Sequence, residues 1–229
     1  RVPSGNQALY FVLAILATFT LLVGAVVVLR QSRKPATLHF FWLTVAFFGV
    51  FAFSFSGRLD WLDWIFYWID IVALLLLAPL FMHFALVFPE RSPGWLQNKL
   101  GRSGLSVLYG PAVVLGGLRT GALWGSTQSG IQVTQTIEVI ERLEVFYLLL
   151  CISGGAVVMI HALRKLQSVT ARRQLRWIIW GTLLGCLPFM VGYLIPWVLG
   201  FNPLPQMGFT AVTLGLVPLA LALAITRYR

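Results

Sequence analysis

The sequence predicts an all-α polytopic membrane protein, folded as a bundle of seven transmembrane helices. Of its 229 residues, 59% are hydrophobic and only 10% are charged, and the mean hydropathy is +0.85. An ordinary soluble domain is about half apolar and about a quarter charged. Seven apolar runs are each long enough to cross a bilayer, which takes roughly 20 residues in a helix. These runs are residues 8–29, 36–56, 61–88, 105–124, 145–163, 177–199 and 208–226.

The basic residues predict the orientation of the bundle. Thirteen of the 17 lysines and arginines lie in segments that a seven-helix chain places on one side of the membrane. Since positively charged loops stay in the cytoplasm, we expect the N-terminus outside and the C-terminus in the cytoplasm. The net charge of +10 then reflects bases beside the anionic headgroups of the lipid bilayer, and nucleic acid is not expected as a partner. The four remaining bases are Arg1, Arg58, Arg119 and Arg142.

Three parts of the chain follow from these assignments. Residues 1–7 are expected to be an extracytoplasmic linker from an upstream domain, because Pro3, Gly5 and Asn6 disfavour regular structure. Residues 8–226 are expected to be the seven-helix domain, and residues 227–229 to begin a cytoplasmic linker to an effector domain. The first run contains no charged side chain and is most simply an anchor.

The second and third runs are separated by a short turn, which predicts an antiparallel helical hairpin. On the third helix, Asp63, Tyr67 and Asp70 would form a polar stripe beside a tryptophan face. Asp70 would lie about 13 Å from Trp61, deep in the bilayer, where an unpaired acid is costly. It is expected to be functional or, as an equal alternative, a structural hydrogen-bonding group.

No lysine or arginine falls in the centre of any run as we assign them, so Asp70 is expected to be neutral. Its predicted hydrogen-bonding partners are Tyr193 on the sixth helix and Thr210 or Thr213 on the seventh. The candidates for signal sensing are therefore Asp63, Tyr67, Asp70, Tyr193 and Thr210.

Two further features concern the second half of the chain. Residues 125–144 are predicted to form a long outer loop, acidic through its three glutamates. In the sixth run Gly181 and Gly185 have the small-xxx-small spacing that allows two membrane helices to pack closely.

The search for chemical sites is mostly negative. Cys151 and Cys186 are expected to be packing residues and not a disulfide. His39, His83 and His161 are all expected to lie near the cytoplasmic interface. A three-histidine metal site, similar to those of catalytic zinc enzymes, is the alternative to three ordinary interfacial histidines. Because these histidines share no local ligand spacing, no metal and no catalytic residue is expected.

The motifs present narrow the functional classes without deciding among them. The sequence contains no glycine-rich phosphate loop, no nucleophile elbow and no HExxH metal motif. A proton-coupled transporter of small solutes is an alternative, because Asp70 among kinked helices is the kind of group that relays protons. An intramembrane metal-dependent enzyme is a second alternative.

Four segments of the chain carry a family resemblance. They are similar to the multi-span N-terminal membrane region of bacterial sensor histidine kinases, of the ComP-like type. In that group an extracytoplasmic PDZ-like domain can precede the helices, and a GAF or histidine kinase module can follow them. The segments are HFFW at 39–42, HFALVFPER at 83–91, RRQLRWIIWGTLLGCLPF at 172–189 and ITRYR at 225–229.

The resemblance implies a sensor and signal-transmission domain of a two-component system, multi-pass in the bacterial cytoplasmic (inner) membrane. It also implies a longer parent protein that binds ATP and Mg²⁺ in a kinase domain, forms a homodimer and acts on a response regulator. None of the three histidines is expected to be the phosphoacceptor, because all lie at membrane spans. The candidates for the cytoplasmic interface and output are His83, Pro89, Arg91, Arg172, Arg173, Arg176, Arg227 and Arg229.

Overall fold

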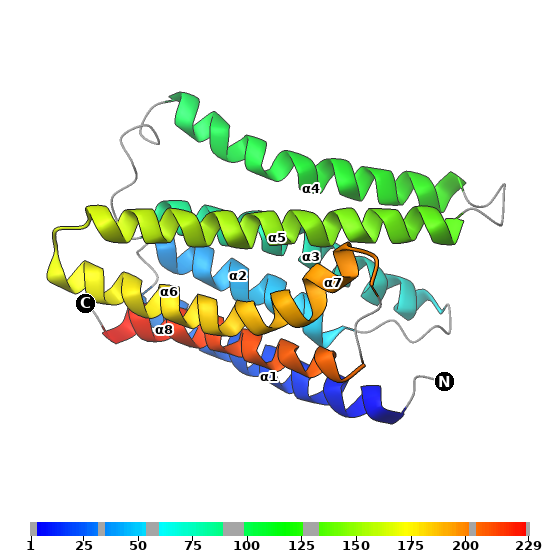
Figure 1. Ribbon diagram of the computed structural model, residues 1–229, viewed down its shortest axis with the longest axis horizontal. Coiled ribbons are helices and arrows are strands. Elements are labelled where there is room, and N and C mark those ends of the chain that lie inside the picture. Colours follow the sequence, from blue (N-terminus) through cyan, green and yellow to red (C-terminus); the bar gives the residue numbers. More distant parts are fainter. Residues whose placement is uncertain are drawn as a thin grey trace.

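The computed structural model describes residues 4–31, 35–53, 60–88, 99–125, 133–201 and 205–227, and over these residues it is built of helices without strands. The helices lie side by side along the longest axis of the molecule (Figure 1). They are α1 (Ser4–Gln31), α2 (Pro35–Ala52), α3 (Trp61–Val87), α4 (Lys99–Gly125), α5 (Val133–Lys165), α6 (Val169–Phe189), the π-helix η2 (Met190–Leu194), α7 (Ile195–Val198), the 3₁₀ helix η3 (Pro205–Gly215) and α8 (Leu216–Arg227).

The predicted all-helical membrane bundle is confirmed. Over most of the residues that the structure describes, each of the seven apolar runs is helical: α6, η2 and α7 together form the sixth, and η3 with α8 forms the seventh. Five helical stretches are long and apolar enough to cross a membrane, and α2 is a shorter apolar helix. Helix α1 begins and helix α8 ends at opposite ends of the bundle (Figure 1), which we call the N-terminal end and the C-terminal end. Which end faces the outside stays a prediction.

The third helix has the boundaries that its sequence predicts, to within one residue. Asp60 and Phe88 flank α3, and both have extended backbone conformations. Phe88 cannot readily continue the helix because Pro89 follows it in the sequence and disfavours the α conformation of the residue before it. The α2–α3 hairpin is also present, with Gly49 of α2 packed against Ala73 of α3.

The prediction of an outer loop at residues 125–144 is wrong over most of that range. Helix α5 begins at Val133 and continues for 33 residues, which is about 50 Å and longer than the roughly 30 Å hydrocarbon layer. Its first turns are polar because they extend past the apolar layer. A pair four residues apart, Glu138 and Arg142, stabilises them through a 2.5 Å ion pair.

Helices α6 and α8 pack at very short range, as the glycine spacing predicts. A methyl group added to Gly181 would lie 2.1 Å from Cβ of Ala220, and one added to Gly185 would lie 2.7 Å from a methyl of Val217. The Thr213 hydroxyl of η3 donates a 2.7 Å hydrogen bond to the Gly185 carbonyl oxygen. These contacts hold α6 against η3 and α8, the last two runs of the bundle.

Two apolar clusters fill the bundle between the described helices. One joins α1, α2, α3, α5, α6 and α8, and it contains Cys186. The other joins α3, α4 and α5 with η2, and it contains Cys151. Both cysteines are buried and unpaired, in agreement with the packing role predicted for them.

Candidate functional site

Helix α4 occupies the periphery of the bundle. Among the described elements it contacts only α3 and α5, and Figure 1 shows it as the outermost helix on one side. Much of its apolar surface is exposed, including Trp124 at 81%. Its glycines at 110, 117 and 121 face open space. Because α4 packs against only two of the described helices, its polar contacts to them are important for its position.

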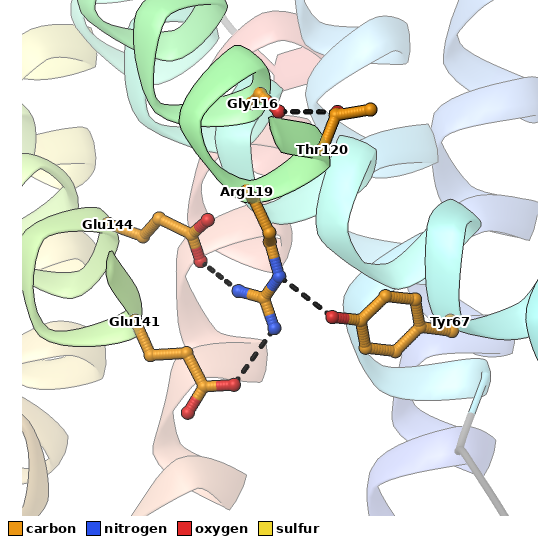
Figure 2. Close-up of polar contacts among 6 residues, drawn as sticks. All are labelled: Tyr67, Gly116, Arg119, Thr120, Glu141 and Glu144. Atoms are coloured by element: carbon orange, nitrogen blue, oxygen red, sulfur yellow. Dashed lines mark hydrogen bonds and ion pairs between the residues drawn. The ribbon is translucent and has the colours of Figure 1, made fainter. Parts of the chain in front are cut away.

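The strongest of these polar contacts is made by Arg119, whose side chain points from α4 between α3 and α5 (Figure 2). Its Nε donates to the Tyr67 hydroxyl at 3.0 Å. Its Nη1 donates to Glu144 at 2.7 Å, and its Nη2 donates to Glu141 at 2.8 Å. The four residues Tyr67, Arg119, Glu141 and Glu144 form what we call the Arg119 network, which joins three helices through one guanidinium.

The two acids of the Arg119 network differ in their access to solvent. The side chain of Glu144 is 1% exposed, whereas that of Glu141 is 40% exposed. Arg119 itself is 4% exposed. Oε1 of Glu144 is buried and has no hydrogen-bond partner among the described residues. One carboxylate of the Arg119 network is therefore sealed, and the other is open to the surroundings.

Asp70 lies next to the Arg119 network. It is half-buried on α3, within electrostatic range of Arg119, Glu141 and Glu144. The expectation that no cation shares its depth is therefore wrong. Because Arg119 falls inside the run at 105–124, its inward-pointing side chain brings the missing positive charge into the bundle.

The other candidates for sensing have different surroundings. Asp63 is buried near the start of α3. Tyr193 of η2 stacks on Phe189, with ring centroids 5.4 Å apart and planes 7° from parallel. The Thr210 hydroxyl donates to the carbonyl oxygen of Met207, one turn earlier in η3. The structure thus brings Tyr67 and Asp70 to the Arg119 network. It places Tyr193 and Thr210 elsewhere, Tyr193 stacked on Phe189 and Thr210 hydrogen-bonded within η3.

A second polar contact lies toward the C-terminal end of the bundle. Nε2 of His39 on α2 lies 3.1 Å from Nε2 of His83 on α3. Nδ1 of His83 lies 3.0 Å from the hydroxyl oxygen of Tyr109 on α4. We call these three residues the histidine contact. Sequence reasoning placed both histidines at one depth but missed Tyr109, because residue spacing does not reveal which way α4 is rotated.

The third histidine of the predicted set does not join them. His161 is exposed on α5. In the part of the chain that the structure describes, no group of three or more histidine, cysteine, aspartate or glutamate side chains is arranged to hold a metal ion. The three-histidine arrangement considered from the sequence is therefore not formed.

An apolar layer separates the Arg119 network from the histidine contact. Leu75 and Ala78 on α3 and Ala112 and Leu115 on α4 lie between them along the two helices, and all four are buried. The same α3–α4 pair is thus joined by polar groups at two levels. Apolar packing fills the space between those levels.

The candidates for output lie at the C-terminal end. Arg172, Arg173 and Arg176 are exposed on α6, and Arg172 donates from Nη2 to the Leu166 carbonyl oxygen at 2.8 Å. Arg227 is the last residue of α8. The three remaining candidates, Pro89, Arg91 and Arg229, lie outside the described residues.

Comparison with known proteins identifies the family. The model of the N-terminal 7TM region of histidine kinases matches residues 12–229, nearly the whole chain. The chain belongs to this family. It is therefore a multi-pass inner-membrane protein that corresponds to the membrane sensor region of a histidine kinase. None of the curated proteins and none of the solved structures compared with the chain matches it.

Proposed function

We propose that this domain senses an extracytoplasmic or intramembrane signal and transmits it to a cytoplasmic histidine kinase of a two-component system. The observation that carries the proposal is the Arg119 network, in which a single buried guanidinium fastens the peripheral helix α4 to α3 and α5. By the distribution of basic residues, the N-terminal end faces the outside, so the Arg119 network lies in the outer half of the membrane.

The Arg119 network has the properties that an input site needs. Glu141 is accessible, so a ligand, an ion or a change of the membrane surface can compete for it. Glu144 and Arg119 are buried, and their mutual contact is strong only while their geometry is kept. A disturbance at Glu141 therefore changes how firmly α4 is held against the other two helices. Asp70 lies within electrostatic range of Arg119 and Glu141, so it also affects the balance of charge around the guanidinium.

The route to the output passes along α3. This helix carries Tyr67 near its start and His83 near its end, and its last turns join the apolar cluster that holds α8. At that end Gln174 of α6 donates from Nε2 to the Ala224 carbonyl oxygen of α8 at 2.6 Å. A signal that favours one of two packings of α3 and α4 would thus change the position of α8, which leads toward the effector.

The output side of the proposal uses the basic residues at the C-terminal end. Arg172, Arg173 and Arg176 would face lipid headgroups and the following domain, and Arg227 and Arg229 would lead into it. Pro89 and Arg91 belong to the same side by sequence. A homodimer of the parent protein, ATP and Mg²⁺ in its kinase domain, and a response regulator complete this proposal.

A proton-coupled transporter is the second candidate, because Asp70 and Glu144 are acids inside the bundle. The buried apolar side chains between the Arg119 network and the histidine contact favour a sensor, since along the described residues of α3 and α4 they separate the two groups of titratable side chains. Flux of solute or protons into sealed vesicles discriminates the two functions. A sensor gives no flux above that of empty vesicles.

The direct test compares two glutamates of α5 that lie one turn apart. Glu141→Gln weakens the Arg119 network, whereas Glu138→Gln disturbs only the surface pair with Arg142. We expect Glu141→Gln to change autophosphorylation of the full-length parent protein in membrane vesicles, and Glu138→Gln to leave it as in the wild type. Equal autophosphorylation in both variants and the wild type would remove the Arg119 network as the input site.

A further inference from the structure

We propose that His39 and His83 form a binding site for a single copper or zinc ion, with Tyr109 as the residue that positions His83. The site is distinct from the Arg119 network and does not depend on the sensor function proposed above. It is carried by the contact of two imidazoles from different helices, together with the phenol on the far nitrogen of one of them.

The distance between the two imidazoles suits a shared ion. Their Nε2 atoms are 3.1 Å apart, and their ring planes are 87° from parallel. Two nitrogens bound to one tetrahedral ion through bonds of about 2.0–2.1 Å lie about 3.3 Å apart. A shift of a few tenths of an ångström between α2 and α3 therefore admits the ion. Imidazole is a preferred ligand of zinc and copper.

Tyr109 completes the arrangement that a metal-bound histidine requires. Metal-binding imidazoles donate the hydrogen of their other ring nitrogen to a neighbouring acceptor, which fixes the tautomer and the ring orientation. His83 has such an acceptor, because its Nδ1 lies 3.0 Å from the Tyr109 hydroxyl oxygen. When Nδ1 of His83 donates to this oxygen, its Nε2 keeps the lone pair that faces His39.

The site is open, which decides what kind of binding it supports. His39, His83 and Tyr109 are half-buried and not sealed within the core. Two protein ligands leave positions on the ion for water or for a lipid phosphate, unlike a closed structural zinc site with four protein ligands. Binding should accordingly be reversible. A bound ion would fasten α2 to α3 in the half of the membrane predicted to face the cytoplasm.

The experiment is a titration of the purified protein in lipid nanodiscs with Zn²⁺ by calorimetry and with Cu²⁺ by electron paramagnetic resonance. The Cu²⁺ spectrum reports how many imidazole nitrogens bind the ion. We expect one ion bound through two imidazoles. His39→Ala and His83→Ala should each abolish the two-imidazole signal, and Tyr109→Phe should weaken binding by roughly tenfold while keeping that signal.

His161→Ala is the matched control, because it removes an exposed histidine that lies outside the site. It should bind the ion as the wild type does. Thermal unfolding without metal shows whether each variant is folded. The proposal is overturned if the double variant His39→Ala/His83→Ala, correctly folded, binds as many ions as tightly as the wild type. It is also overturned if the wild type shows no two-imidazole signal, because His39 and His83 would then be hydrogen-bonded partners only.

Discussion

Helix α4 and the α6–α8 pair are held in the bundle in opposite ways. The α6–α8 pair is packed backbone to backbone, with Gly181 and Gly185 so close to their neighbours that no side chain fits. Helix α4 has glycines too, but those at 110, 117 and 121 face open space. Besides its apolar contacts with α3 and α5, it is held by a buried arginine at one level and by Tyr109 at another.

This difference indicates which helices of the bundle a signal can move. In lipid, close packing of small residues depends on shape, and neither a proton nor an ion alters it. A charged network or a histidine contact depends on the charge and occupancy of a few groups, which a signal can change. We therefore expect α4 to be the responsive helix and α6–α8 to be the rigid one.

The largest effect is expected from Arg119→Leu. The substitution leaves Glu144 buried without its partner, and breaking a buried ion pair from one side costs about 3–5 kcal/mol. Denaturation of the protein in mixed micelles measures the loss. Arg119→Lys should recover only part of it, because an ammonium cannot reproduce the three separate hydrogen bonds. A stability equal to that of the wild type would show that the Arg119 network does not hold α4.

A second prediction compares the two acids of the Arg119 network. Glu144→Gln removes a buried hydrogen bond between charged groups and should cost about 1.5–3 kcal/mol. Glu141→Gln removes a more exposed pair and should cost less than about 1 kcal/mol. The same denaturation assay ranks them. If Glu141→Gln proves the more damaging variant, burial does not govern the strength of the Arg119 network.

A third prediction uses matched glycines on the two sides of the comparison. Gly181→Ala places a methyl group 2.1 Å from Ala220, and the required shift of the helices should cost about 1–3 kcal/mol. Gly117→Ala meets no atom within 4 Å and should be neutral or stabilising by up to about 1 kcal/mol. Equal losses in both variants would contradict the view that α6–α8 depends on close approach and α4 does not.

Hydropathy was sufficient to predict the helices but not their rotation. The end of α3 at Phe88 and the approach of α6 to α8 follow from local residues, Pro89 and the glycine spacing, and both were predicted. The start of α5 was not, because Glu138, Glu141 and Glu144 are too polar for a membrane run although they continue the same helix.

The candidate site was predicted only in part, for a related reason. Tyr67 and Asp70 were recognised from their shared stripe on α3, yet their cation was missed. The rule that assigns positive charges to loops treated Arg119 as an outer-side base, and it does not consider a base that turns inward to meet acids. Likewise His39 and His83 could be placed at one depth, whereas their 3.1 Å contact depends on how two helices face each other.

The smallest effect on stability is expected at Asp70, and it tests how far the Arg119 network extends. Asp70 is half-buried and acts on Arg119 at a distance, so Asp70→Asn should change stability by less than about 1 kcal/mol. Asp70→Leu should be equally well folded, because leucine suits lipid. Their outputs separate the two roles: autophosphorylation in vesicles is kept by Asn and lost by Leu if the carboxyl is a hydrogen-bonding group. Both variants lose it if the negative charge or a proton at Asp70 sets the balance around Arg119. Normal output in both variants, at every pH at which the wild type is assayed, would limit the input site to Tyr67, Arg119, Glu141 and Glu144.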